Sequence, residues 1–219
     1  MKRIRTLLLG GKPCKWLFCG DSITQGAKHT NAHRDYTQLF AEHVRTTLGR
    51  GEDAIINMGL SGNTTRDLVE KFDWRVRQFS PDAVFLMFGM NDCDTRKVPL
   101  EEFKTNLLWL IRQITANDGL PVLQTTNPIV PGQAPSREPA FPEYMAALKE
   151  AAEENAVPII DHTSHWLALQ AFPVGWMADA IHPNAQGHAA IASYLLKQMD
   201  ETAEARYPLA PATFHFDGR

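Results

Sequence analysis

A serine, a histidine and an aspartate stand where they could together activate an alcohol oxygen. Ser22 follows the apolar run 16–19, and Asp179 and His182 lie three residues apart near the end of the chain. A serine hydroxyl becomes a strong nucleophile when a histidine takes its proton and a carboxylate orients that histidine. One turn lets Asp179 accept the Nδ1 proton and leaves Nε2 for Ser22. We therefore predict Ser22, His182 and Asp179 as the catalytic set for acyl transfer.

Two further loops supply donors for the negative charge that forms on the substrate oxygen during acyl transfer. Gly62 can expose its backbone N–H without an obstructing side chain, and Asn91 can offer its amide NH₂. The backbone N–H of Ser22 is a third donor, at the start of a helix whose dipole favours negative charge. The predicted oxyanion hole is therefore Ser22, Gly62 and Asn91.

Residues beside these loops are expected to line the substrate pocket. They are Asp21, Met90, Trp176 and Met177. Asp21 is also expected to accept hydrogen bonds from nearby loop N–H groups, because aspartate favours such turns. Core packing is the alternative role for Trp176 and Met177, and the sequence does not decide between the two.

The other histidines are weaker candidates for catalysis or metal binding. His162 follows Asp161 at the end of the last apolar run, but adjacent side chains point apart more readily than they pair. The spacings of His29 with His33 and of His162 with His165 could suit zinc. The three cysteines are scattered, however, so they do not complete such a site. We predict no metal and no cofactor.

Short apolar runs alternate with longer segments of helical period. The runs are apolar throughout, which suits strands that are covered on both faces. The expected strands are 16–19, 54–58, 83–88, 121–125 and 157–160, and the expected helices are 36–48, 64–78, 101–116, 141–155 and 185–203. This order predicts an α/β fold with three α/β/α layers and a doubly wound parallel sheet. Ligands of such sheets bind beyond the carboxyl ends of the strands, where the loops described above converge.

Four blocks of the chain resemble the SGNH, or GDSL-like, hydrolase family. The signature residues of that family match Ser22, Gly62, Asn91 and His182, and the resemblance spans residues 16 to about 195. It implies a flavodoxin-like sheet of five parallel strands, no metal, and ester hydrolysis through an acyl-enzyme. Isoleucine follows Ser22 where the family's name has leucine. The Gly-x-Ser-x-Gly motif of the general α/β-hydrolase fold occurs nowhere in the sequence.

The predicted activity is hydrolysis of a small acyl ester. Acetyl is the favoured acyl group, and family analogy favours a carbohydrate as the alcohol part. The alternative is a lysophospholipase or thioesterase that acts on longer acyl chains. A nonenzymatic binding module would be expected to lose Ser22, His182 or Asp179, and a flavodoxin-type nucleotide binder would need a glycine-rich phosphate loop that the sequence lacks.

Composition and charge indicate a soluble globular protein. The 219 residues are 44% hydrophobic and 21% charged, with a formal net charge of −3 and no block of like charges. Nothing therefore suggests a nucleic-acid or membrane partner, and the expected partner is a small-molecule ester. Self-association into a homo-oligomer is left open by the sequence.

Three cysteines and the N-terminal segment predict a cytoplasmic protein. An odd, scattered set of cysteines does not form a disulfide framework, which favours a reducing compartment. The apolar stretch 6–9 is shorter than the roughly 7–15 residues of a signal peptide core. One domain over 1–219 is expected, with a core of about 14–203 and a C-terminal tail at 204–219. The long proline-rich connection 127–142 is expected to be a functional loop.

Overall fold

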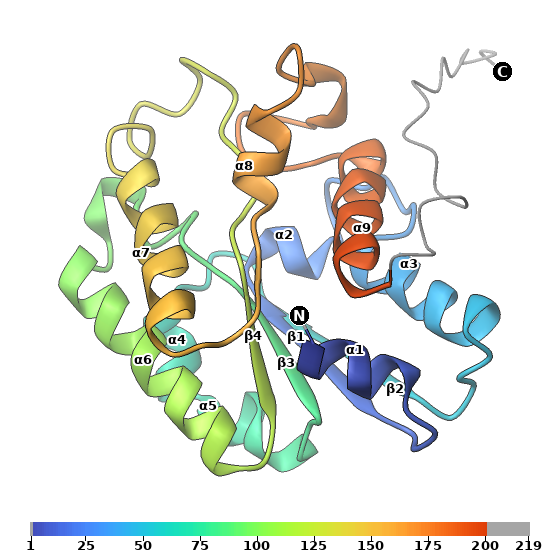
Figure 1. The fold of residues 1–219 in the computed structure, drawn as a ribbon. Coiled ribbons are helices and arrows are strands. Elements are labelled where there is room, and N and C mark those ends of the chain that lie inside the picture. Colours follow the sequence, from blue (N-terminus) through green and yellow to red (C-terminus); the bar gives the residue numbers. More distant parts are fainter. Residues whose placement is uncertain (1, 201–219) are drawn as a thin grey trace, which may run out of the picture.

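The computed structural model describes residues 2–200, in which a parallel sheet lies between two layers of helices (Figure 1). The strand order is β2-β1-β3-β4-β5, and every neighbouring pair is parallel. The strands are β1 (Lys15–Gly20), β2 (Ala54–Gly59), β3 (Ala83–Met87), β4 (Leu120–Gln124) and β5 (Ile159–Ile160). This order is that of flavodoxin-like sheets. The predicted three-layer, five-stranded parallel fold is confirmed.

The helices divide between the two faces of the sheet. The helices of one face are α1 (Lys2–Leu9), α3 (Tyr36–Glu42) and α9 (Ala185–Met199). The helices of the other face are α4 (Thr65–Glu70), α5 (Phe72–Arg75), α6 (Leu100–Ala116) and α7 (Phe141–Glu154). Shorter helical elements are α2 (Ser22–Gln25), η1 (His43–Thr47), η2 (Arg77–Phe79), η3 (Asp94–Arg96), α8 (His162–Leu167) and η4 (Val174–Trp176). The chain crosses from β1 to β2 on one face and from β2 to β3 on the other, so β1 and β3 flank the switch point where such sheets bind ligands.

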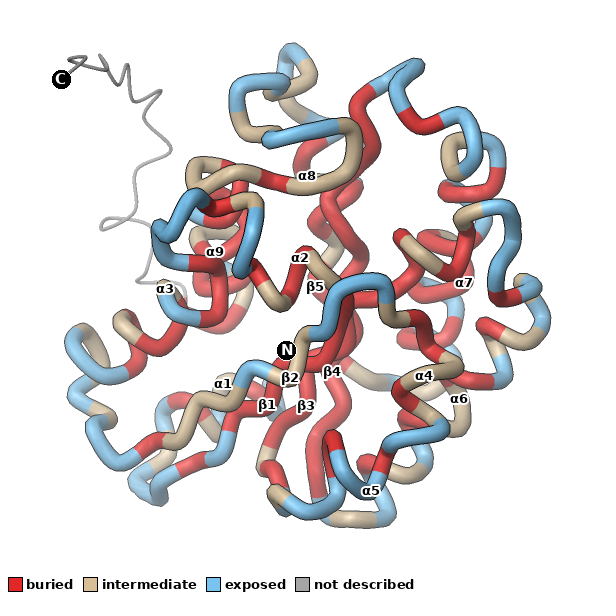
Figure 2. The backbone as a smooth tube through the Cα atoms, turned by 180° about the vertical axis from the view of Figure 1, so that it is seen from behind, coloured by how far each residue is buried: buried red, intermediate tan, exposed pale blue. Residues whose placement is uncertain are grey.

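The central strands carry the core, as Figure 2 shows by their red colour. Every residue of β3 and β4 is buried, and β1 is buried after its first residue. Phe18 of β1 and Phe85 of β3 stack with their ring centroids 4.4 Å apart. Strand β2 lies at the edge and is only partly buried, although its run of apolar residues predicted cover on both faces. An edge strand has a neighbour on one side only, and the sequence pattern does not show which strand takes that place.

Several segments, α8 among them, differ from the predicted helices. The expected helix 64–78 is interrupted at Lys71 and Val76 and forms α4, α5 and η2 instead. These interruptions accompany the inward turn of Arg75, whose buried guanidinium donates to Met58 O and Asn63 Oδ1. Helix α1 was not predicted.

The N-terminal helix α1 buries one side against the rest of the fold. Ile4 and Leu8 are fully covered, and Arg5 Nη2 donates to Gln198 O of α9 at 3.4 Å. No helix among residues 2–200 combines the length and the apolar character that crossing a bilayer requires. The predicted tail 204–219 lies outside the described residues.

Candidate active site

Ser22 begins a one-turn helix that rests on the carboxyl ends of two strands. Asp21 is the N-cap of this helix, and its Oδ1 accepts from Ile23 N at 2.9 Å. Glycines end both strands beneath it: a Cβ at Gly20 would lie 2.8 Å from Met87 O, and one at Gly59 would lie 2.7 Å from the carbonyl carbon of Thr24. Only glycine fits under α2 at these two positions, so the height of Ser22 above the sheet is fixed. Because α2 has a single turn, the helix dipole that was expected to favour negative charge at Ser22 is small.

The predicted serine, histidine and aspartate form a continuous chain of hydrogen bonds. Ser22 Oγ lies 2.8 Å from His182 Nε2. His182 Nδ1 lies 2.8 Å from Asp179 Oδ2 and 3.0 Å from Asp179 Oδ1. A carboxylate on Nδ1 fixes the proton there and leaves the lone pair of Nε2 facing the hydroxyl, which is the arrangement that deprotonates a serine.

The loop that carries Asp179 and His182 is held by backbone contacts. Asp179 Oδ1 accepts from the N–H of Ile181 at 2.9 Å and of His182 at 2.8 Å. Partial burial opposes ionisation of Asp179, but these backbone donors and then His182 outweigh it and lower the pKa of the carboxyl. Asn127, at the start of the proline-rich connection, donates its Nδ2 to Ile181 O at 3.0 Å. The loop 127–142 therefore supports the histidine segment.

The two predicted oxyanion residues outside α2 lie on loops after β2 and β3. Asn91 Nδ2 donates to Asn63 O at 3.1 Å and lies 3.4 Å from Asp21 Oδ2, so its amide is oriented by both neighbouring blocks. Gly62 has a φ of 79°, a left-handed conformation that favours glycine. Its backbone N–H donates to no group within residues 2–200. That N–H is free to bind an oxyanion.

A buried aspartate braces the Asn91 loop from below. Asp92 is fully buried and accepts from Thr65 N and Thr65 Oγ1 at 2.8 and 2.6 Å and from Gly89 N at 3.0 Å. It thereby joins the start of α4 to the end of β3. Burial raises the pKa of Asp92, because the surroundings disfavour the charged form more than the donors favour it. Asp92 therefore supports the loop rather than acting as a base.

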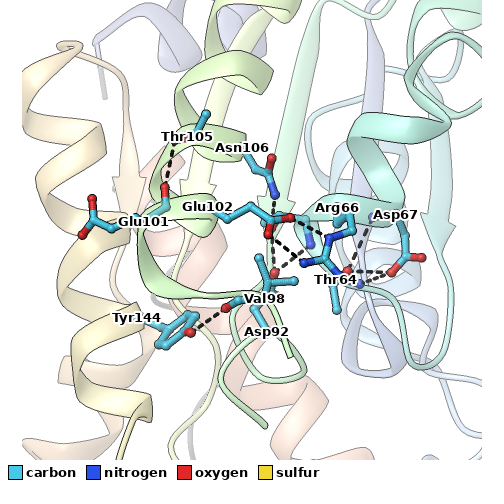
Figure 3. A network of polar contacts seen from close by, with 11 residues as sticks. Thr64, Arg66, Asp67, Asp92, Val98, Glu101, Glu102, Thr105, Asn106 and Tyr144 are labelled. Atoms are coloured by element: carbon cyan, nitrogen blue, oxygen red, sulfur yellow. Dashed lines mark hydrogen bonds and ion pairs between the residues drawn. The ribbon is translucent and has the colours of Figure 1, made fainter. Parts of the chain in front are cut away.

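Further polar contacts hold α4, α6 and α7 around this brace (Figure 3). Thr64 caps α4 in a reciprocal capping box with Asp67. Arg66 of α4 forms two hydrogen bonds with Glu102 of α6, at 2.6 and 2.7 Å. Tyr144 Oη of α7 donates to Val98 O at 2.6 Å. The oxyanion loops are thus attached to three helices of one layer.

The carboxyl of Asp21, beside the nucleophile, is buried like that of Asp92. Burial raises the pKa of Asp21 to about 7, and the nearby Asp92 adds to the rise, while the hydrogen bond from Ile23 N opposes it. The pKa of Asp21 therefore lies within the range in which an esterase is assayed.

Asp21 and Met90, which were predicted to line the substrate pocket, are buried. Each is only 1% exposed. Asp21 contacts the oxyanion asparagine, and Met90 O accepts from Arg137 Nε at 3.1 Å. Trp176 and Met177 are half-buried, and Trp176 packs its ring edge-on to Trp166 at 5.1 Å. Both stay predicted pocket residues.

The histidines fall into two groups in the structure. His162 is fully buried beside Gln124, at 3.1 Å, and burial lowers its pKa to about 3, so it takes no part in the site. His29 instead lies against the catalytic segment: His29 Nε2 is 3.5 Å from Asp179 Oδ2, and its ring stacks on His182. The sequence offered His29 as a zinc ligand with His33 and as a weaker rival of His182, and it did not predict the contact between His29 and His182. Its place in the loop after the Ser22 block was the available signal that it would lie near Ser22.

His29, Asp179 and His182 offer ligand atoms that all lie within 4.8 Å of one another. The two imidazole rings are nearly parallel, with an interplanar angle of 11° and centroids 3.7 Å apart. A metal ion binds in the plane of an imidazole at about 2.0–2.1 Å. One ion cannot lie in two stacked planes at that distance, so the arrangement does not fit a metal without rotation of a ring.

The comparison with known families decides which class of protein this site belongs to. The model of the GDSL-like Lipase/Acylhydrolase family matches residues 18–190. The chain belongs to this family. The predicted SGNH (GDSL-like) membership is confirmed, and the predicted class of enzyme, a carboxylic ester hydrolase, is confirmed with it.

Individual similar proteins extend the comparison. The chain is 26% identical over 172 residues to the uncharacterized lipoprotein YqeF of Bacillus subtilis, which covers 68% of this chain and 70% of that protein. It is 25% identical over 204 residues to an acetylxylan esterase of Geobacillus stearothermophilus, which covers 84% and 93%. The structure of an arginine variant of Axe2, an acetyl-xylooligosaccharide esterase of that organism, is 25% identical with a TM-score of 0.74 and covers 87% and 95%.

Three further solved variants of Axe2 are described as catalytic mutants. They replace a serine, an aspartate and a histidine, and the aspartate lies three positions before the histidine.

Proposed function

We propose that this GDSL-like hydrolase removes acetyl groups from a carbohydrate through an acyl-enzyme on Ser22. The observation that carries the proposal is the chain of hydrogen bonds from Ser22 Oγ through His182 to Asp179, with both links at 2.8 Å. The acetyl-carbohydrate substrate is supported by the similarity to the acetylxylan esterase along 84% of the chain.

In the first half-reaction, Ser22 Oγ attacks the carbonyl carbon of the ester while His182 Nε2 takes the hydroxyl proton. Asp179 stabilises the imidazolium that forms, through its contact with Nδ1. The tetrahedral oxyanion is bound by the N–H of Ser22, the N–H of Gly62 and the Nδ2 of Asn91. Collapse returns the proton from His182 to the departing alcohol and leaves an acyl group on Ser22.

In the second half-reaction, water replaces the alcohol. His182 takes a proton from the water as it attacks the acyl carbon, and the same donors bind the second oxyanion. The carboxylic acid departs and Ser22 Oγ regains its proton. Apart from the attacking water, residues of this chain supply the groups that these steps use.

The test uses purified full-length protein and two independent readouts. A fluorophosphonate should label wild-type protein, and peptide mapping should place the label on Ser22. A panel of p-nitrophenyl esters from acetyl to decanoyl should give the highest kcat/KM for acetyl, and Ser22→Ala should lower kcat by about 10⁴-fold or more. Ser164→Ala, whose hydroxyl donates to Asp161 Oδ2 and to none of the predicted site residues, is the matched control and should leave kcat unchanged. A label on another residue would remove the acyl-enzyme from the proposal.

The same panel tests the second candidate. A kcat/KM that rises with the length of the acyl chain would favour the alternative, a lysophospholipase or thioesterase activity. Release of acetate from an acetylated xylo-oligosaccharide tests the alcohol part directly. If the protein is fully active on p-nitrophenyl acetate but releases no acetate from the oligosaccharide, the acetyl esterase activity stands and the carbohydrate substrate is overturned.

The cytoplasm is the proposed location. Its support is that Cys14, Cys19 and Cys93 are all free and buried. Because the similar YqeF is a lipoprotein, membrane attachment is the competing outcome. Cell fractionation that recovers the protein with membranes would exclude the cytoplasm. A small-molecule ester as the partner stays a prediction, and a homo-oligomer as the assembly stays open.

A further inference from the structure

His29 is an additional histidine at the catalytic centre. It lies in the loop that joins α2 to α3 and is 19% exposed. Its ring lies over the face of His182, with centroids 3.7 Å apart and an angle of 11° between the planes. This contact covers one side of the imidazole that faces Ser22, so it restricts the rotation of that ring.

The same residue also borders the carboxylate of the base pair. His29 Nε2 lies 3.5 Å from Asp179 Oδ2, the oxygen that accepts from His182 Nδ1. The side chain of Asp179 is 45% exposed, so water reaches the carboxylate elsewhere and weakens its hold on the histidine. The ring of His29 excludes water from one side of this contact.

We infer that neutral His29 is a positioning residue, which holds His182 toward Ser22 by stacking and which impairs the base when it becomes charged. The inference rests on the proposed function, in which His182 becomes positively charged at each proton transfer. A neutral ring at 3.7 Å tolerates and partly stabilises that charge through its π face. A protonated ring at the same distance repels it and draws Asp179 away from His182.

Burial and the groups around His29 together favour its neutral form. Burial lowers the pKa of His29 most, followed by the nearby His182 and, more weakly, by Lys28, while Asp179 opposes the fall. His188 of α9 faces the same pair, and burial lowers its pKa to about 3, so it stays neutral during assays. Since the pKa of His29 lies below its ordinary value, the charged form appears only on the acid side, where activity should fall.

The experiment compares the pH dependence of wild-type protein, His29→Phe, His29→Ala and the control His33→Phe. His33 lies in the same loop and is exposed, so its replacement removes a histidine without touching the pair. The readouts are the rate of fluorophosphonate labelling of Ser22, and kcat and KM for p-nitrophenyl acetate, from about pH 4.5 to about pH 9.

Wild-type protein and His33→Phe should lose activity in acid with a limiting slope about 1 greater than that of His29→Phe, because in them both stacked rings must be neutral. His29→Phe keeps an uncharged ring, so at pH 8 it should keep a higher kcat than His29→Ala. His29→Ala removes the stack and should lower kcat by about threefold to tenfold at pH 8 without a change in KM.

The outcomes separate this inference from the proposed function. If the fluorophosphonate labels Ser22 in none of the proteins, wild type included, the proposed function is overturned. Normal labelling with the same acid slope in wild type and His29→Phe would overturn the role of His29 alone. A change confined to KM in His29→Ala would also overturn it, because that result would describe a substrate contact.

Discussion

The nucleophile side and the base side of this active site are built in opposite ways. On the nucleophile side, Asp21 and Asp92 are buried and accept hydrogen bonds from the loops they support. On the base side, Asp179 is 45% exposed and its loop is held by backbone contacts and by Asn127. A buried carboxylate must be satisfied by fixed donors, so it defines one geometry. Water competes for an exposed carboxylate, so such a group fixes the geometry of its neighbours less strictly. The oxyanion donors therefore receive the more rigid support, in keeping with the preorganisation that they require.

Between the two sides, the largest expected effect comes from removing an oxyanion donor on the nucleophile side. Asn91→Ala should lower kcat by about 10²–10³-fold with little change in KM, because the amide binds charge that exists only in the transition state. Asn117→Ala, at the end of α6 and remote from Ser22, is the matched control. Steady-state kinetics on p-nitrophenyl acetate measure the difference. An unchanged kcat in Asn91→Ala would remove this residue from the oxyanion hole.

The next effect should appear in stability rather than in chemistry. Asp92→Ala leaves Thr65 N, Thr65 Oγ1 and Gly89 N without their acceptor in a buried place, which should lower the free energy of unfolding by about 2–4 kcal/mol. Asp73→Ala removes a carboxylate that is 75% exposed and should change it by less than about 0.5 kcal/mol. Urea unfolding measures both. Equal unfolding midpoints for the two variants would contradict the difference drawn between buried and exposed carboxylates.

The smallest effect of the three is expected on the exposed side. Asp179→Ala should lower kcat by about 10–10²-fold, less than the roughly 10⁴-fold that a buried triad carboxylate contributes, because water can take over part of its role. Its free energy of unfolding should change by less than about 1 kcal/mol. Kinetics and urea unfolding of the same preparation provide the measurement. A loss of stability as large as that of Asp92→Ala would mean that the base side is as rigid as the nucleophile side.

The edge of the sheet at which the site forms could be predicted because it follows from the backbone alone. Parallel strands place the loops after β1, β2 and β3 at one edge, so Ser22, Gly62 and Asn91 had to lie near one another once the strands were identified. The spacing of Asp179 and His182 within one turn likewise required no knowledge of the rest of the fold.

The depth of side chains could not be predicted in the same way. Asp21 and Met90 are adjacent to site residues in the sequence, yet the neighbouring elements cover them completely. His29 shows the converse, because a loop without helical or strand pattern brings it onto His182. Local sequence determines which loop a residue belongs to. Tertiary packing determines which way its side chain points.

The two glycines under α2 connect the chemistry to the alignment of an edge strand. Gly20 and Gly59 are direct partners in the pairing of β1 with β2. If β2 slid by one position, Met58 or Leu60 would stand opposite Gly20, and a side chain would push α2 upward together with Ser22. A mispaired molecule could keep its buried centre and its helices and still hydrolyse nothing. Measured turnover therefore reports whether the strands are correctly aligned. Spectroscopic measures of folding would miss such a misalignment.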